Sequence, residues 1–212
     1  MNKFIAFDLD GTLFNTVQGI TLAINDSLEH FGYNKSYTED EIKKFLGHGA
    51  RYLYQKATNK VDFSDEEYEY FQISYVKNQG VSEPFPMVKE TLQKLSILGY
   101  KLIVYSNKPN GALQYLVNDK LGEIKWDKIQ GNVSDYPTKP NPLLLNKIMA
   151  DLKLDPKDGF YVGDSSVDCE TAHNANLKCI ILTYGYDDYS KINEYNPEYV
   201  IDSFDKIINI VR

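Results

Sequence analysis

Clusters of basic residues, long apolar runs and a cysteine framework are all missing from this 212-residue sequence. The net charge of -7 and the lack of a Lys/Arg cluster argue against a nucleic acid or an anionic membrane as the partner, because both require a basic face. The two cysteines, Cys169 and Cys179, do not have the pattern of a disulfide framework or of a metal knuckle. We expect both to be buried thiols in a reducing compartment.

Signals for membrane insertion or export are also absent. No apolar run is long enough to span a bilayer, and the opening apolar stretch is too short for a signal peptide and ends in acidic residues. We therefore expect a cytoplasmic protein. Hydrophobic residues make up 42% and charged residues 25% of the sequence, as in globular proteins. The length allows one large domain, or a core domain with a small insertion.

Two aspartates close to the N-terminus are the most informative feature. Residues 4–7 are apolar without a break, which is typical of a strand buried on both faces of a parallel sheet. Asp8 and Asp10 follow, and side chains two apart on an extended chain point to the same side. Gly11 then allows a tight turn close to a ligand. Two acids directed at one point favour a divalent cation between them, although an acidic turn before a helix would give the same pattern.

Apolar runs alternate with segments of helical spacing along the rest of the sequence. This alternation predicts an α/β fold, with a doubly wound, Rossmann-like parallel sheet that carries helices on both faces. The predicted strands are residues 4–7, 101–105, 128–130, 159–162, 178–182 and a minor one at 198–201.

One connection in this pattern is abnormally long. About ninety residues separate the first two predicted strands, whereas a whole βαβ unit needs only ~30. The excess is helical, with capping boxes at 38–41 and 64–67, and ends in a linker at 80–86 that contains two prolines. We therefore expect a helical cap domain at residues 15–81, inserted into an α/β core made of residues 1–14 and 82–212. Its position directly after the paired aspartates suits a lid.

Three later loops also carry polar groups. Ser106 and Asn107 end the second predicted strand, Lys139 precedes a predicted helix, and Asp164 and Asp168 flank the start of another. Taken singly, each loop is also explained by ordinary turn, surface or helix-capping chemistry. If the first strand is central, however, these loops share one crevice at the carboxyl ends of the strands, where doubly wound sheets bind their ligands.

At these residues the sequence resembles the haloacid dehalogenase superfamily, and in particular its phosphoglycolate phosphatase-like branch. Four motifs in the same order carry the resemblance: Asp8-Leu9-Asp10-Gly11-Thr12, then Ser106, then Lys139 in Lys-Pro-Asn-Pro, then Gly163-Asp164 with Asp168. The resemblance covers nearly the whole chain, and it implies that the inserted helices are the helical cap of that superfamily.

The resemblance implies a role for each motif. Asp8 would be the nucleophile that forms an aspartyl-phosphate, and Asp10 the general acid and base. Mg²⁺ would be bound by Asp8, the Asp10 backbone carbonyl and Asp164, with Asp168 in support, and Lys139 would be the protein cation that offsets the acids and the substrate. The expected phosphate-binding residues are Thr12, Ser106, Asn107 and Lys139.

The expected activity is Mg²⁺-dependent hydrolysis of a small phosphomonoester, possibly phosphoglycolate, by a monomer or homodimer. Substrate contacts from the cap are predicted for Gly47, His48, Gly49 and Arg51, although this stretch can equally be a helix end followed by the next helix start. A sugar phosphomutase resembling β-phosphoglucomutase is an alternative, and a non-catalytic phosphate-binding module is another. The acid at Asp10 favours phosphate esters over halides, since a halide leaves without a proton.

Overall fold

The computed structural model describes residues 3–212 and contains a six-stranded parallel sheet in the order β5-β4-β1-β6-β7-β8. The strands are β1 (Phe4–Phe7), β4 (Lys101–Pro109), β5 (Lys128–Asn132), β6 (Gly159–Gly163), β7 (Lys178–Leu182) and β8 (Tyr199–Ile201). β1 pairs in parallel with β4 on one side and with β6 on the other. The strand order therefore reverses around β1, as the sequence predicts, and this reversal creates the crevice at its carboxyl end.

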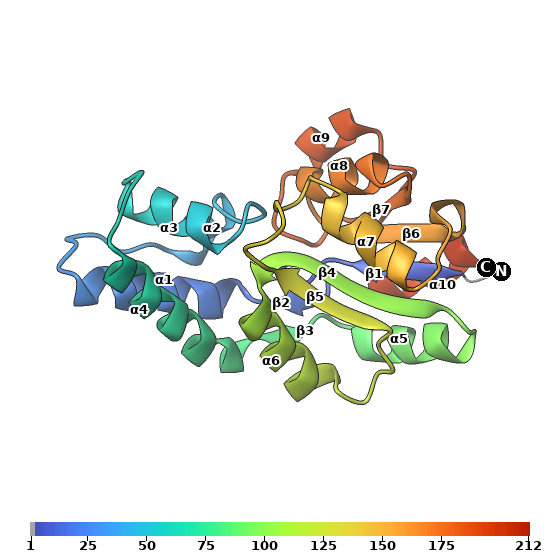
Figure 1. Cartoon of the computed structure of the whole chain (residues 1–212), viewed down its shortest axis with the longest axis horizontal. Helices are drawn as coiled ribbons and strands as arrows, with labels where there is room; N and C mark the ends of the chain where they lie inside the picture. Colours follow the sequence, from blue (N-terminus) through green and yellow to red (C-terminus); the bar gives the residue numbers. More distant parts are fainter. Residues whose placement is uncertain (1–2) are drawn as a thin grey trace.

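Successive residues of β1 are buried in different layers. Ile5 and Phe7 belong to one apolar cluster, and Phe4 and Ala6 to the other. Helices α5 (Val88–Ile97), α6 (Asn110–Leu121) and α10 (Ile207–Val211) supply side chains to the first cluster, and α7 (Leu143–Asp151), α8 (Ser166–Asn174) and α9 (Tyr189–Ile192) to the second. The two sets of helices cover opposite faces of the sheet (Figure 1). The doubly wound α/β prediction is confirmed, and the unbroken apolar run of β1 follows from burial on both faces.

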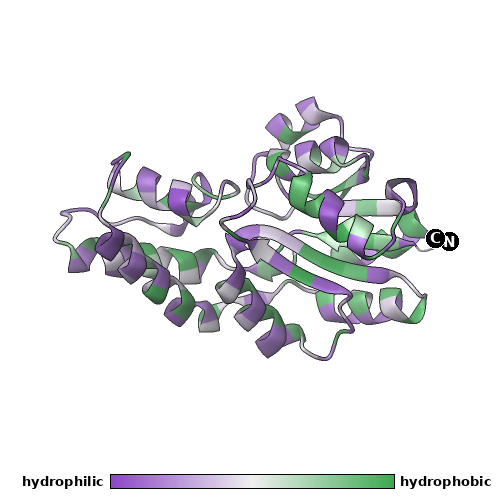
Figure 2. Cartoon of the chain, viewed as in Figure 1, coloured by the Kyte–Doolittle hydropathy of each residue, from purple (hydrophilic) through white to green (hydrophobic). Residues whose placement is uncertain are grey.

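Four helices extend from one end of the core (Figure 1). They are α1 (Val17–His30), α2 (Glu39–Lys43), α3 (Ala50–Thr58) and α4 (Asp65–Lys77). Both predicted capping boxes are present, with Thr38 and Ser64 as the N-caps of α2 and α4. The four helices enclose an apolar cluster of their own around Tyr54 and Phe71. Hydrophobic residues fill the strands of the core sheet, whereas these helices mix hydrophilic and hydrophobic positions along their length (Figure 2).

The chain passes between core and helices at a small two-stranded ribbon. β2 (Phe14–Asn15) pairs antiparallel with β3 (Glu83–Pro84), and a 3₁₀ turn, η1 (Asn78–Val81), precedes β3. The linker predicted at 80–86 contains the second strand of this ribbon. The chain leaves the core through β2 and returns through β3, and the two strands lie side by side with their backbone groups hydrogen-bonded to each other. Local sequence does not reveal such a pairing between distant segments.

Several predicted boundaries differ from the structure. β4 continues four residues beyond its predicted end at residue 105, with a register shift against β5 between Tyr105 and Pro109. The helix predicted after Lys139 is α7, which begins at Leu143, and the Asn141 side chain accepts a hydrogen bond from the Leu143 N–H. Further 3₁₀ turns are η2 (Pro156–Asp158), η3 (Asn193–Tyr195) and η4 (Phe204–Lys206).

Two expectations from composition can also be checked. Cys169 and Cys179 are both free and buried, as predicted. Within residues 3–212, no helix has the length and apolar character needed to cross a membrane.

Candidate active site

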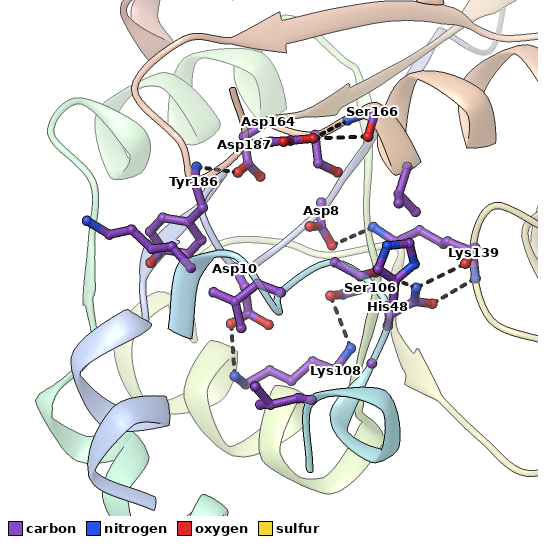
Figure 3. A pocket seen from close by; sticks show the side chains of 18 of the residues that line it. Asp8, Asp10, His48, Ser106, Lys108, Lys139, Asp164, Ser166, Tyr186 and Asp187 are labelled. Carbon is purple, nitrogen blue, oxygen red and sulfur yellow. Dashed lines mark hydrogen bonds and ion pairs between the residues drawn. The ribbon is translucent and has the colours of Figure 1, made fainter. Parts of the chain in front are cut away.

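The carboxyl ends of β1, β4 and β6 meet at a cavity of about 520 Å³ between the core and the four helices. Asp8, Ser106, Lys139 and Asp164 all line it, although they lie far apart in the sequence. Figure 3 shows them directed toward one another from different strands and loops. The shared crevice predicted for these loops is therefore present in the structure.

Three buried carboxylates gather at one end of the cavity. Asp8, Asp164 and Asp168 each offer an oxygen, and these three oxygens lie within 4.8 Å of one another. Burial raises the pKa of Asp8 from its ordinary 3.8 to about 6, and it raises the pKa of Asp164 well above its usual range, with Asp168 and Asp8 adding to that effect. Placing three desolvated carboxylates this close together costs free energy of folding unless positive charge is present.

Lys139 supplies one such charge. Its Nζ lies 2.8 Å from Asp8 Oδ1 and 2.6 Å from Asp168 Oδ1, and it donates a 3.0 Å hydrogen bond to Tyr161 Oη. Burial lowers the pKa of Lys139, but Asp168 and Asp8 together raise it well above its ordinary value. Lys139 is therefore a permanent cation in the position that the sequence predicted.

Asp168 has both carboxylate oxygens engaged. Oδ1 pairs with Lys139, and Oδ2 accepts hydrogen bonds from Ser165 Oγ at 2.6 Å and from the Asp164 N–H at 3.2 Å. Ser165 is the N-cap of α8, so Asp168 completes a capping box in the first helical turn, as expected. Because its oxygens are occupied, Asp168 orients Lys139 and the Asp164 loop.

Asp164 lies among backbone groups that approach it closely. It accepts hydrogen bonds from Thr12 Oγ1 and from the Tyr186 N–H, both at 2.8 Å. A Cβ atom at Gly11 would lie 2.3 Å from Asp164 Oδ2, and one at Gly185 would lie 2.1 Å from Asp164 Cβ. Gly11, with a φ of +84°, therefore makes room for this side chain, whereas the sequence suggested room for a ligand. Thr12, expected to bind phosphate, donates to Asp164 here.

The Asn107 side chain is engaged by the backbone of two loops. Its Oδ1 accepts a 2.7 Å hydrogen bond from the Lys139 N–H, and its Nδ2 donates to the Gly47 carbonyl at 2.8 Å. Both ends of the carboxamide are therefore in use, one holding the Lys139 loop and one holding the loop after α2. This side chain links the core to the cap helices and positions Lys139.

Asp10 belongs to a separate corner of the site. Its Oδ1 lies 2.9 Å from Lys108 Nζ, which also donates a 3.0 Å hydrogen bond to Tyr75 Oη of α4. The Lys108 side chain is fully buried, and burial lowers its pKa while the Asp10 carboxylate opposes that effect. The expectation that Lys139 is the site's one protein cation is therefore wrong. Lys108 stands in the Ser-Asn-Lys-Pro stretch, but nothing local distinguishes it from a surface lysine.

Ser106 is directed into the cavity with its hydroxyl proton free for a ligand. Its Oγ accepts a 3.3 Å hydrogen bond from the Lys108 N–H, and the side chain is almost completely buried (Figure 3). A hydroxyl whose acceptor side is occupied can direct its proton at an anion. This geometry fits the predicted phosphate contact.

The predicted contacts from the cap separate into two groups. Gly47, His48 and Gly49 line the cavity, and Gly49 is also the N-cap of α3, so both interpretations of this stretch apply. Arg51 does not line it. Its guanidinium lies 4.8 Å from the ring centroid of Phe63, and the residue is exposed. Ala50 and Leu53 of α3 do line the cavity, so Arg51 lies on a different side of this helix.

Tyr186 is another residue that the sequence did not reveal. Its N–H donates to Asp164, and its hydroxyl accepts hydrogen bonds from the Thr16 and Val17 N–H groups and donates to Asn15 Oδ1 at 2.9 Å. One residue, through its backbone N–H and its hydroxyl, thus connects the acidic cluster to the first turn of α1, where the chain leaves the core. The contact spans 170 residues, and no short motif signals it.

The donor set fits a divalent cation. Asp8 Oδ1 is buried and forms an ion pair with Lys139, but it accepts no hydrogen bond of good geometry from residues 3–212. Asp8 and Asp164 offer hard oxygen ligands at a point already crowded with negative charge. A divalent metal would relieve the repulsion that raises the pKa of both acids.

Comparison with known proteins is consistent with this geometry. The sequence profile of the family described as haloacid dehalogenase-like hydrolase matches residues 5–182. The chain is 34% identical over 220 residues to a phosphoglycolate phosphatase of Haemophilus influenzae (strain 86-028NP), covering 99% of this chain and 98% of that protein. A phosphoglycolate phosphatase of Vibrio parahaemolyticus is 32% identical over 222 residues, with 99% and 96% covered.

Solved structures show the same similarity. The crystal structure of a predicted phosphoglycolate phosphatase from Haemophilus somnus 129pt superposes with a TM-score of 0.88 at 31% identity, over 99% of this chain and 98% of that one. CbbY from Rhodobacter sphaeroides, solved in complex with phosphate, has a TM-score of 0.81 at 20% identity, over 98% and 96%. The second comparison shows a shared fold.

Proposed function

Because the chain belongs to the haloacid dehalogenase-like hydrolase family and is a phosphomonoester hydrolase similar to phosphoglycolate phosphatases, we propose that it is an Mg²⁺-dependent phosphatase for small phosphomonoesters, with phosphoglycolate as the first candidate. The observation that carries the proposal is the buried cluster of Asp8, Asp164 and Asp168 around Lys139 at the switch point of the sheet. Such a cluster suits an anionic substrate only when a metal offsets its charge.

Asp8 and Asp164 would hold the metal together with the Asp10 backbone carbonyl, and Asp168 would support them by orienting Lys139. When bound, Mg²⁺ supplies positive charge that lets an anionic nucleophile and an anionic phosphate approach each other. Lys139 contributes a second charge at the same place, and its ion pair with Asp8 holds that carboxyl in place and opposes the effect of burial on its pKa.

The two aspartates of the first motif would share the chemistry. A carboxylate oxygen of Asp8 attacks phosphorus, the bond from phosphorus to the ester oxygen breaks, and the Asp10 carboxyl gives its proton to the departing oxygen. Water then attacks the phosphorus of the aspartyl-phosphate, Asp10 takes a proton from that water, and the Asp8 carboxylate leaves. The Ser106 hydroxyl holds an oxygen of the phosphoryl group during both steps.

The cavity also suggests the class of leaving group. His48, Lys43, Lys44 and Lys191 also line it, so a second anionic group on a short substrate would be favoured near them. Phosphoglycolate carries a carboxylate of that kind. A cavity of about 520 Å³ shared with the cap suits a metabolite and leaves little room for a polymer.

The remaining features of the protein are proposed on the same basis. We place the cap domain at residues 15–81 and the core at 1–14 and 82–212, since the β2–β3 ribbon lies at the junction. A small phosphorylated metabolite is the proposed partner. A monomer or homodimer in the cytoplasm is the proposed state.

A panel of small phosphate esters tests the activity. Phosphate release is measured with and without Mg²⁺, with phosphoglycolate and a hexose 1-phosphate among the substrates and Asp8→Asn as the control variant. We expect Mg²⁺-dependent release, fastest from esters with a second anionic group. Conversion of the hexose 1-phosphate into an isomer without free phosphate would instead identify a phosphomutase. Binding of esters without turnover would identify a non-catalytic module.

A further inference from the structure

The buried lysine of the second motif makes contacts that the proposed chemistry does not yet use. Lys108 Nζ lies 2.9 Å from Asp10 Oδ1, 3.0 Å from Tyr75 Oη and 4.6 Å from the centroid of the Tyr75 ring. No part of the Lys108 side chain is exposed to solvent. Asp10 belongs to the core and Tyr75 to helix α4, so one ammonium group connects the two parts across the cavity.

The backbone is built to place Lys108 there. Between Tyr105 and Pro109, β4 has two residues more than the matching stretch of β5, which is a bulge. A Cβ at Gly131 of β5 would lie 2.6 Å from the Lys108 carbonyl, so glycine makes the bulge possible. The bulge directs Ser106 and Lys108 to the same cavity, and the Lys108 N–H also donates to Ser106 Oγ.

We propose that Lys108 is a positioning residue that aims the Asp10 carboxyl at the oxygen of the leaving group, and that Tyr75 fixes Lys108 from the cap. The proposal rests on the proposed function, in which Asp10 protonates that oxygen. It implies that the acid is correctly aimed only while α4 lies against the core. A carboxyl without this contact can rotate away, and misplacement of a reacting group by about 1 Å can cost on the order of 10² in rate.

Two esters with different leaving groups separate this role from phosphate binding. The alkoxide released from phosphoglycolate needs a proton as its bond breaks, whereas the aryl oxide released from p-nitrophenyl phosphate is stable without one. A residue that aims Asp10 therefore affects kcat/KM, which reports formation of the aspartyl-phosphate, strongly for the first ester and little for the second. A residue that binds the phosphoryl group matters equally for both.

The test compares kcat and KM for both esters in the wild type, Lys108→Met and Tyr75→Phe, with Lys147→Met as a control. Lys147 is an exposed lysine on α7 that pairs with Asp151, and we expect its variant to match the wild type. Lys108→Met should lose roughly tenfold to a hundredfold in kcat/KM on phosphoglycolate and stay within about threefold in kcat/KM on p-nitrophenyl phosphate. Tyr75→Phe keeps the ring and loses only the hydroxyl. It should also lower activity more on phosphoglycolate than on p-nitrophenyl phosphate, but by a smaller factor than Lys108→Met.

A double-mutant cycle completes the test. In the Asp10→Asn background, Lys108→Met should cause no further loss on phosphoglycolate, since the group it aims is already inactive. Equal loss on both esters, or an additive loss in the double variant, would overturn the positioning role while the phosphatase activity stands. Wild-type rates in Tyr75→Phe would overturn the part assigned to the cap. Wild-type protein that released phosphate from neither ester would contradict the proposed function, and the role of Lys108 with it.

Discussion

The two buried lysines of the site differ in where their partners come from. Lys139 contacts Asp8 of the β1 end, Asp168 of α8 and Tyr161 of β6, all of them core residues. Lys108 contacts Asp10 of the core but also Tyr75 of the cap helix α4. The charge-balancing end of the cavity is thus complete within the core, whereas the proposed acid–base end is completed by α4. The proposed cap therefore contributes a contact to the site itself.

The largest expected effect concerns the two aspartates that these lysines hold. Asp8→Asn should abolish turnover, because a carboxamide cannot form the aspartyl-phosphate. Asp10→Asn should retain a measurable rate, reduced by on the order of 10²–10⁴, the usual contribution of a general acid and base. Phosphate release with phosphoglycolate and Mg²⁺ checks both variants. Equal losses of turnover in the two variants would contradict the different roles proposed for Asp8 and Asp10.

The next effect is on stability. Lys139→Met should lower the free energy of unfolding by about 3–5 kcal/mol, because it leaves two buried carboxylates without their cation. Lys108→Met should cost less, since it leaves one carboxylate, and the Asp10 side chain keeps 17% of its surface exposed. Urea denaturation of both metal-free variants measures the difference. A larger decrease in the free energy of unfolding for Lys108→Met than for Lys139→Met would contradict this prediction.

The pH dependence of stability is a third test. Burial raises the pKa of Asp8 to about 6 from an ordinary 3.8. Between these values the folded protein holds a proton that the unfolded chain has released, so the free energy of unfolding of the metal-free protein should fall as pH rises, by on the order of 3 kcal/mol. In Asp8→Asn this part of the pH dependence of the free energy of unfolding should be absent. Mg²⁺ should stabilise the wild type more at pH 7 than at pH 5, where it must displace that proton.

The smallest effect separates two cap residues. Arg51→Met should leave kcat and KM unchanged and cost about 0.5–1 kcal/mol, since Arg51 only stacks on the exposed side of Phe63 and Tyr68. His48→Ala, at a position that lines the cavity, should raise KM for phosphoglycolate. Steady-state kinetics with both variants measures these changes. A raised KM in Arg51→Met would mean that Arg51 reaches the substrate.

The sequence predicted the core well because its signals are local. The apolar run of residues 4–7 predicted a strand buried on both faces, and Asp8 and Asp164 were placed together because parallel strands bring their ends to one edge. The capping boxes at Thr38 and Ser64 predicted two helix starts correctly. Each strand or helix start is decided within a short stretch, and the general topology of parallel sheets brings the strand ends together.

The missed features depend on contacts between distant segments. The bulge that places Lys108 in the cavity requires Gly131 on the neighbouring strand. The Lys108 ammonium group donates a hydrogen bond to Tyr75, thirty-three residues earlier in the chain. The Asn107 carboxamide is held at both ends by the backbone of two other loops, which its position at a strand end does not reveal. Propensity and spacing carry no information about such pairs.

Trapping the aspartyl-phosphate is the most direct test of the proposed nucleophilic attack by Asp8. Wild-type protein and Asp10→Asn are quenched in acid during turnover of phosphoglycolate with Mg²⁺, and their peptides are mapped by mass spectrometry. We predict a phosphoryl group on the Asp8 side chain, more abundant in Asp10→Asn, in which the hydrolysis of the intermediate is slowed. Phosphate release at the normal rate from Asp8→Asn, with no phosphorylated peptide in any variant, would contradict the account.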